Sequence, residues 1–214
     1  MATRFLVIRH GFSENNAVRR FTGQADVPLS PLGHEQARLV ADYLCQNEHV
    51  DAFYASDLCR AVDTLVPSAA RLGLSVIPEP ALRETDVGDW TNRVYEEVES
   101  TERETMARHR ADPDFPIPGG ESNRQVFDRV TSCIHRLAKL HPDHTVVLAT
   151  HAMPARCIEA MSAEHGIEQI GAHRVAPNAS IRAYTYKGGR LTSLGSNVVS
   201  HLEKQGEHLP TELI

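Results

Sequence analysis

Two continuous apolar runs, each followed by a histidine, constrain the fold of this chain more than any other feature. The first run covers residues 5–8 and leads into Arg9 and His10, and the second covers residues 145–150 and leads into His151. Uninterrupted apolar strands are typical of parallel sheets that are covered on both faces. Open α/β sheets bind ligands beyond the carboxyl ends of their strands. We therefore expect Arg9, His10 and His151 to lie at a ligand-binding edge.

Strand patterns alternate with helical patterns along most of the chain. Ser30 followed by Pro31 indicates a helix start, and the apolar spacing after it predicts a helix to about Asn47. This alternation predicts an α/β fold, with a mainly parallel central sheet flanked by helices on both faces and an antiparallel end. The other expected elements are strands at 51–56 and 74–78, helices at 60–72, 94–110 and 126–140, a helix that opens at 152–154, and a hairpin of strands 180–186 and 190–197 joined by Gly188-Gly189.

The length of 214 residues fits one domain with a sizeable core, and we expect a single domain over residues 1–214. A dense cluster of turn-forming residues at 112–120 is interpreted as a loop, because helical patterning resumes directly after it. Residues 12–29 are polar and long for a connecting loop. Such loops in compact domains are often functional.

Charge and cysteine content exclude several kinds of partner. The formal net charge of −6 argues against bulk electrostatic binding of nucleic acid or an anionic membrane. An anionic substrate must therefore meet a local cluster of cations. Cys45, Cys59, Cys133 and Cys157 form no CxxC pair and no metal-type spacing, which suits a reducing compartment. No apolar stretch approaches the roughly 20 residues of a membrane span, and no signal pattern opens the chain, so we expect a cytoplasmic protein.

Arg60 and Glu84 follow two further expected strands. Arg60 lies in the first turn of a helix, where a cation opposes the helix dipole; a solvated arginine and an anion-binding arginine are both open interpretations. Two histidines, two arginines and a carboxylate at one sheet edge suit phosphoryl transfer through a covalent phosphohistidine. A dinucleotide-binding fold does not fit, because no G-x-G-x-x-G follows the first strand.

Short motifs follow one another in a distinctive order over essentially the whole chain. They are Arg9-His10-Gly11 with Asn16, Thr22-Gly23, Pro28-Leu29-Ser30 with Gly33 and Gln36-Ala37, Ser56-Asp57-Leu58-Cys59-Arg60-Ala61 with Thr64, Leu82-Arg83-Glu84 with Gly88 and Trp90, Pro118-Gly119-Gly120-Glu121-Ser122, Thr150-His151, Asn178 with Ser180, and Asn197 with His201-Leu202. In this order they resemble the histidine phosphatase superfamily, which includes cofactor-dependent phosphoglycerate mutases and many small phosphatases. Phe12 and Ala152 depart from the family pattern, which leaves the substrate open.

The resemblance implies a phosphoglycerate mutase-like fold, in which about residues 92–121 form a short helical insertion over the active site. It also implies a mechanism without a metal or another cofactor. His10 attacks phosphorus, Glu84 protonates the leaving alcohol and then takes a proton from water, and a protonated His151 is favoured by the phosphate dianion. Arg9, Arg60 and His151 surround the phosphoryl oxygens. Further contacts to phosphate or substrate are implied for Gly11, Asn16, Thr22, Gly23 and Ala152.

The resemblance favours a phosphomonoester phosphatase that acts on a small phosphorylated metabolite, with no nucleic-acid or membrane partner. The alternative is a phosphoglycerate mutase that uses 2,3-bisphosphoglycerate. Mutases of the family carry a longer, more basic insertion, whereas the segment 92–117 is short but contains Arg93, Arg103, Arg108 and Arg110. A non-catalytic phospholigand-binding protein is disfavoured, because all five catalytic positions are intact. The oligomeric state is left open, with a homodimer among the options.

Overall fold

A six-stranded sheet forms the centre of the computed structural model, which describes residues 1–204 and 207–208. The spatial order of its strands is β3-β2-β4-β1-β5-β6. Their bounds are β1 (Ala2–Arg9), β2 (Ala52–Ala55), β3 (Val76–Pro78), β4 (Thr145–Thr150), β5 (Ile181–Lys187) and β6 (Arg190–Ser193). A separate two-stranded ladder joins β7 (Glu203–Lys204) to β8 (Glu207–His208).

The two apolar runs are neighbouring parallel strands. Strand β1 pairs with β4 in a register that sets Arg9 opposite Thr150, and the His10 backbone N–H donates to the Thr150 carbonyl at 2.9 Å. Strands β2 and β3 continue the parallel part, whereas β5 and β6 run antiparallel. This confirms the predicted sheet. Strand β6 ends at Ser193 instead of 197, because Gly195 adopts a φ of 148° and turns the chain away.

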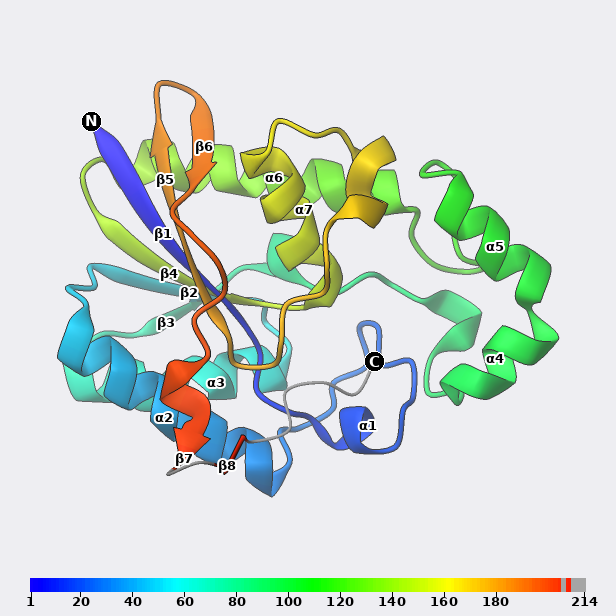
Figure 1. The fold of residues 1–214 in the computed structure, drawn as a ribbon, viewed down its shortest axis with the longest axis horizontal. Helices are drawn as coiled ribbons and strands as arrows, with labels where there is room; N and C mark the ends of the chain where they lie inside the picture. Colours follow the sequence, from blue (N-terminus) through cyan, green and yellow to red (C-terminus); the bar gives the residue numbers. More distant parts are fainter. Residues whose placement is uncertain (205–206, 209–214) are drawn as a thin grey trace.

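Helices cover both faces of this sheet, as predicted (Figure 1). Helices α2 and α3 lie on one face, and α6 and α7 lie on the other. The α-helices are α1 (Glu14–Ala17), α2 (Pro31–Asn47), α3 (Cys59–Leu72), α4 (Tyr95–Thr101), α5 (Arg103–Ala111), α6 (Asn123–Leu140) and α7 (Ala152–Ser162). Short 3₁₀ turns are η1 (Pro80–Leu82), η2 (Gly88–Trp90), η3 (Ile167–Ala172) and η4 (Ser200–Leu202). None of the described helices is long and apolar enough to cross a membrane.

The alternation of side chains along β1 explains why its sequence is apolar without interruption. Phe5 and Val7 join the buried cluster beneath α6 and α7, whereas Leu6 and Ile8 join the cluster beneath α2 and α3. Successive side chains of a strand point to opposite faces, so a strand covered on both sides needs an apolar residue at every position.

The helix boundaries follow local capping with two departures from expectation. Ser30 caps α2 and Ser122 forms a capping box with Gln125 at the start of α6. The polar loop at 12–29 contains the unpredicted α1, where Ser13 forms the same kind of box with an asparagine in place of Glu or Gln. The stretch predicted as helical at 94–110 divides into α4 and α5 at Glu102, which ends one helix and begins the next.

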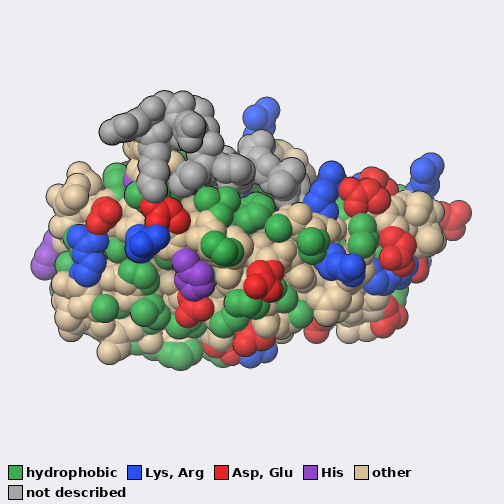
Figure 2. Space-filling model, turned by 90° about the horizontal axis from the view of Figure 1, so that it is seen from below, with side chains coloured by type: hydrophobic (Ala, Val, Ile, Leu, Met, Phe, Trp, Pro, Cys, Tyr) green, Lys and Arg blue, Asp and Glu red, His purple; other side chains and the backbone are tan. Residues whose placement is uncertain are grey.

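Helices α4 and α5 project beyond one end of the sheet (Figure 1). They have a small buried cluster of their own, formed by Val87, Trp90, Val98, Met106 and Ile117, with Phe21 packed against it. Figure 2 shows that side chains of both charges gather on the outer surface at this end. The organisation as a single domain stays a prediction, and residues 205–206 and 209–214 of that domain lie outside the described residues.

Two leucines of α6 provide a test of the core. Leu137 is fully buried, whereas Leu140, three residues further along the same helix, is 58% exposed. We expect Leu137→Ala to lower the free energy of unfolding by about 2–5 kcal/mol, because it removes buried methyl groups and leaves a cavity. Leu140→Ala should change it by less than about 0.5 kcal/mol. Urea unfolding of the two variants measures both values, and equal losses would contradict this placement of α6.

Candidate active site

A cavity of about 300 Å³ opens at the carboxyl ends of the parallel strands. Arg9 and His10 reach it from the end of β1, and Arg60 reaches it from the start of α3. Glu84 enters from the loop after η1, and Asn16 enters from α1. The fold therefore brings together residues that are far apart in the sequence, at the sheet edge where open α/β folds bind ligands.

The geometry of His10 suits the predicted role of nucleophile. Its Nδ1 lies 2.7 Å from the Gly11 carbonyl oxygen, so Nδ1 carries the proton and donates it, and Nε2 keeps a free lone pair. The side-chain amide of Asn178 donates to the His10 carbonyl at 2.9 Å and holds this backbone in place. Burial, together with the nearby Arg60 and Arg9 cations, lowers the pKa of His10 well below its ordinary value. The imidazole is therefore neutral before substrate binds.

His151 lies directly beside His10. The two ring centroids are 5.0 Å apart, and both ring nitrogens of His151 are buried without a hydrogen-bond partner among the described residues. Burial and then Arg60, His10, Arg9 and Arg129 lower the pKa of His151 well below its ordinary value. Unpaired buried polar atoms destabilise a protein unless a ligand satisfies them. A phosphate dianion would supply an acceptor and favour the imidazolium, so the expected protonated His151 belongs to the ligand-bound state.

Backbone carbonyls hold the two arginines in position. Arg60, although 1% exposed, donates from Nη1 to the Ala25 carbonyl and from Nη2 to the Gly23 carbonyl, both at 2.8 Å. Arg9 donates from Nη1 to the Ala176 carbonyl at 2.8 Å. The Nε atoms of both guanidinium groups are buried without a partner among the described residues. Burial lowers the pKa of Arg9 to about 10, so its guanidinium stays charged at neutral pH. The 1% exposure of Arg60 contradicts the interpretation of that residue as a solvated arginine.

Glu84 lies at the start of α7, next to His151. Its Oε2 accepts a hydrogen bond from the Ala152 N–H at 3.0 Å, and its Oε1 accepts from the Met153 and Thr85 N–H groups at 3.2 and 2.9 Å. The helix has no side-chain cap from His151, its own N-cap residue, so Glu84 supplies that cap from a distant loop. The carboxyl group is thereby oriented at the edge of the cavity.

Four of the five residues predicted to contact phosphate or substrate line the cavity: Asn16, Thr22, Gly23 and Ala152. The side-chain oxygen of Asn16 accepts from Ser13, which leaves its amide nitrogen to donate to a ligand. Gly11 is not among the lining residues, and its contact with a ligand stays a prediction. Its N–H donates to Thr64 at 2.9 Å, and a Cβ at this position would lie 2.8 Å from the Gly33 carbonyl oxygen. Gly11 thus admits another backbone segment.

Part of the segment expected over the active site, about residues 92–121, lines the cavity, but sequence reasoning assigned to the site none of the side chains of this outer wall. Its side chains come from the loop after α1 and from the region that carries α4 and α5, namely Arg20, Phe21, Val87, Trp90, Tyr95, Met106, His109, Arg110 and Ile117. Phe21 packs against Trp90 and Tyr95, with ring centroids 5.4 and 5.3 Å apart. The aromatic character of Trp90 and Tyr95 was a signal, but an apolar residue near a helix is as typical of a core as of a pocket wall.

These features define a phosphoryl-transfer site, and similarity to known proteins gives its family. The family model described as histidine phosphatase superfamily (branch 1) matches residues 5–199, so the chain belongs to that superfamily. Phosphoglycerate mutase-like protein 4 of Arabidopsis thaliana is 33% identical over 208 residues, which cover 94% of this chain and 87% of that one. Phosphoserine phosphatase 1 of Hydrogenobacter thermophilus is 35% identical over 156 residues, which cover 72% of this chain and 74% of that one.

A solved structure agrees with this assignment. A mycobacterial glucosyl-3-phosphoglycerate phosphatase, in complex with VO3, matches with a TM-score of 0.81 and 29% identity, covering 89% of this chain and 96% of that one. The predicted family and fold class are therefore confirmed. The predicted enzyme class, a phosphoric monoester hydrolase, is confirmed at the level of the family by relatives that are named as phosphatases.

The neutral state of the buried histidines predicts how stability depends on pH. As the pH falls below about 6.5, the unfolded chain binds protons that native His10 and His151 do not bind, because their native pKa values are lowered, so stability falls as the pH falls. Each such proton contributes up to about 1.4 kcal/mol per pH unit. We expect His151→Gln to make the pH dependence of the unfolding free energy shallower in this range.

Denaturant unfolding at several pH values measures that slope. His49→Gln is the control, because the His49 side chain is 89% exposed. A His151→Gln slope equal to that of the unsubstituted protein would show that His151 binds its proton in the native state.

Proposed function

We propose that this protein hydrolyses phosphomonoesters in two steps through a phosphohistidine on His10. In the first step His10 Nε2 attacks phosphorus, the bond from phosphorus to the ester oxygen breaks, and Glu84 gives its proton to that oxygen. In the second step Glu84 takes a proton from water while the water oxygen attacks phosphorus and the N–P bond breaks. The observation that carries this proposal is the pairing of a neutral His10 with His151, whose ring nitrogens are buried and unsatisfied.

Charge on the cavity walls supports a substrate with a second anionic group. Among the described residues, Arg20, Arg110 and Arg156 line the cavity without forming an ion pair, and Glu84 is the one carboxylate that lines it. Arg20 and Arg110 donate instead to neutral oxygens, those of Asn92 and Tyr95. A transferred phosphoryl group accounts for Arg9 and Arg60 and leaves these further cations without a counter-ion. Phosphoserine and glucosyl-3-phosphoglycerate, the compounds in two relatives' names, both carry a carboxylate besides the phosphate.

The remaining expectations stay proposals. Histidine and arginine side chains supply the nucleophile and the charge in the proposed reaction, so it calls for no metal or other cofactor. The four cysteines are free thiols, which supports a reducing, cytoplasmic setting. A homodimer remains one option for the assembly.

The arginines of the cavity wall support the mutase alternative less than they support a phosphatase. Of the arginines in the segment 92–117, Arg93 pairs with Glu97 and Glu102, and Arg108 lies 4.1 Å from the Phe115 ring centroid. Arg110 alone of the four expected arginines is among the residues that line the described cavity. A mutase must hold a bisphosphorylated intermediate and exclude water from it. A single cation from this segment offers little to bind the second phosphate, which favours hydrolysis over the mutase reaction.

The first experiment measures phosphate release from 4-nitrophenyl, phenyl and ethyl phosphate and from 3-phosphoglycerate, beside His10→Ala. Release should vanish in His10→Ala. Glu84→Gln should lower kcat/KM by at least about a hundredfold for ethyl phosphate, whose leaving group needs a proton, and far less for 4-nitrophenyl phosphate. Equal losses on all esters would remove Glu84 from the role of acid. Isomerisation of 3-phosphoglycerate with 2,3-bisphosphoglycerate, without phosphate release, would make the protein a mutase.

The second experiment tests the additional anion with a matched pair of substrates. 3-Phosphoglycerate and glycerol 3-phosphate differ in one position, a carboxylate in place of a hydroxymethyl group. We expect kcat/KM to favour 3-phosphoglycerate by about tenfold or more, because a charged hydrogen bond contributes about 1.5–3 kcal/mol. Arg110→Gln should reduce that preference, mainly through KM. Arg103→Gln is the matched control from the same helix, and equal kcat/KM values for the two esters in the unsubstituted protein would contradict the proposal.

A further inference from the structure

Arg129 on α6 uses three donors of its guanidinium group on the loop that carries Glu84 and the other two on Glu121. Nη1 donates to the carbonyls of Ala81 and Arg83 at 2.8 and 2.6 Å, and Nη2 donates to the Glu84 carbonyl at 2.9 Å. The two remaining N–H groups, on Nε and Nη2, donate to the two carboxylate oxygens of Glu121, each at 3.0 Å. An arginine has five N–H donors in a fixed planar fork, so this one is fully satisfied.

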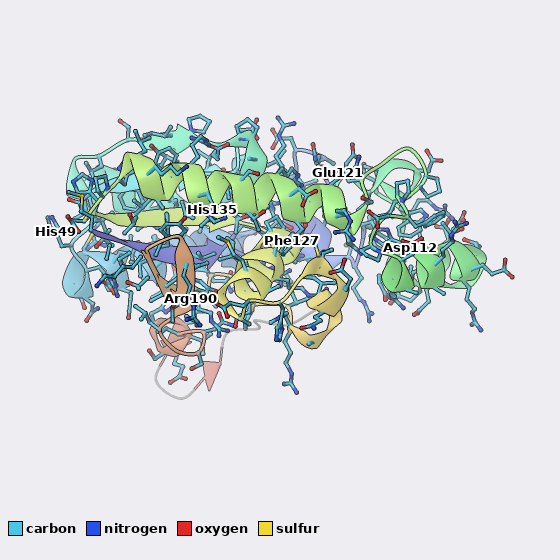
Figure 3. The ribbon with its side chains drawn as sticks, turned by 90° about the horizontal axis from the view of Figure 1, so that it is seen from above. His49, Asp112, Glu121, Phe127, His135 and Arg190 are labelled. Atoms are coloured by element: carbon cyan, nitrogen blue, oxygen red, sulfur yellow. The ribbon has the colours of Figure 1, made fainter. Side chains whose placement is uncertain are left out.

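Glu121 extends the same contact to the other side of Glu84. Its Oε2 accepts from the Asp86 N–H at 2.8 Å, and its own backbone N–H donates to the Asp86 carbonyl at 2.9 Å. Figure 3 shows Glu121 at the end of α6 that faces α5. The loop at 81–86 is thus held by Arg129 of helix α6 and by Glu121 of the segment that precedes α6.

A close backbone contact completes this arrangement. The Asp89 N–H donates to the Pro118 carbonyl at 2.9 Å, and Gly88 has a φ of +46°. A Cβ on Gly88 would lie 2.1 Å from the Pro118 oxygen, so a side chain at this position would separate the two segments. The segments 84–89 and 117–121 therefore pack as one unit.

We infer that the Arg129–Glu121 ion pair is a positioning device for the acid Glu84, and the inference rests on the proposed role of Glu84. All five N–H donors of Arg129 and both carboxylate oxygens of Glu121 are engaged within the protein, so neither residue is expected to touch substrate. Their contacts fix the backbone of Glu84, and the helix α7 N-terminus fixes its carboxyl group. Proton transfer requires hydrogen-bond distance to the leaving oxygen, so a small shift of this loop impairs the acid without disturbing His10.

The test uses Arg129→Lys and the milder Glu121→Gln. Lysine keeps the charge but has three donors and no planar fork, so it cannot hold Glu121 and three carbonyls together. We expect kcat/KM for ethyl phosphate to fall at least about tenfold in both variants, while kcat/KM for 4-nitrophenyl phosphate stays within about threefold. The double variant should lose no more than the stronger single variant, because the two residues act as one unit.

Arg136→Lys is the matched control. Arg136 lies on the same helix and pairs with Glu79, the N-cap residue of η1. The substitution alters a comparable ion pair, but among the described residues Arg136 itself donates to none of residues 81–84. It should leave the ratio of the two kcat/KM values unchanged. Hydrolysis of 4-nitrophenyl phosphate also reports that each variant retains a folded site.

Three results would overturn the inference. Equal losses on both esters in Arg129→Lys and Glu121→Gln would indicate a general effect on folding. If the ratio of kcat/KM for ethyl phosphate to kcat/KM for 4-nitrophenyl phosphate changes in Glu84→Gln but not in Arg129→Lys or Glu121→Gln, Glu84 is the acid and the ion pair does not position it. An unchanged ratio in Glu84→Gln itself would overturn the acid assignment and the inference together.

Discussion

The parallel pairing of β1 with β4 is the contact on which the site depends. A histidine directly follows each strand, and the pairing of Arg9 with Thr150 makes those histidines neighbours. The His10 N–H continues the ladder by donating to the Thr150 carbonyl. A slip of one residue would turn every side chain of β1 to the opposite face and move His10 out of line with His151. The packing of both sheet faces therefore also fixes the distance between the two imidazoles.

Burial leaves the site with unsatisfied polar nitrogens. Arg9, Arg60 and His151 are buried, and each retains a nitrogen without a partner among the described residues. Burial, together with the Arg60 and Arg9 cations, lowers the pKa values of His10 and His151, because burial and like charge both disfavour an imidazolium. In the proposed reaction one phosphate dianion would satisfy these nitrogens and compensate the positive charge. The same groups would then stabilise charge on the transferred phosphoryl oxygens without reorganising.

Much of this arrangement could be predicted from the sequence, because local signals and distant contacts coincide there. The strands before His10 and His151 are apolar runs. Serine is a common N-cap residue, and Ser30 and Ser122 cap α2 and α6. The role of Gly11 could not be read in the same way, because its neighbour Gly33 is brought there by the tertiary fold.

The cavity wall shows a second limit of local patterns. Met106 is buried among the residues of its own small cluster and also lines the cavity, and a hydrophobic pattern carries no sign of that second surface. Arg129 likewise follows the periodicity of an amphipathic helix, and its carbonyl partners are nearly fifty residues away in the sequence. Contacts of this kind depend on where loops cross helices, and periodicity contains no information about such crossings.

The site has two halves that are built differently: one consists of strand ends, and the other of the loop at 81–86 together with helices α4 and α5. His10 and His151 lie at strand ends, and the ladder leaves them little freedom. Glu84 lies on the loop at 81–86, and the helices α4 and α5 carry the outer wall, so this half is held by side-chain contacts such as the ion pair of Arg129 with Glu121. Side-chain contacts can change one at a time, whereas a strand register changes all at once. A chemistry fixed by strands and a specificity fixed by loops can therefore vary independently, which accounts for relatives with different named substrates on one fold.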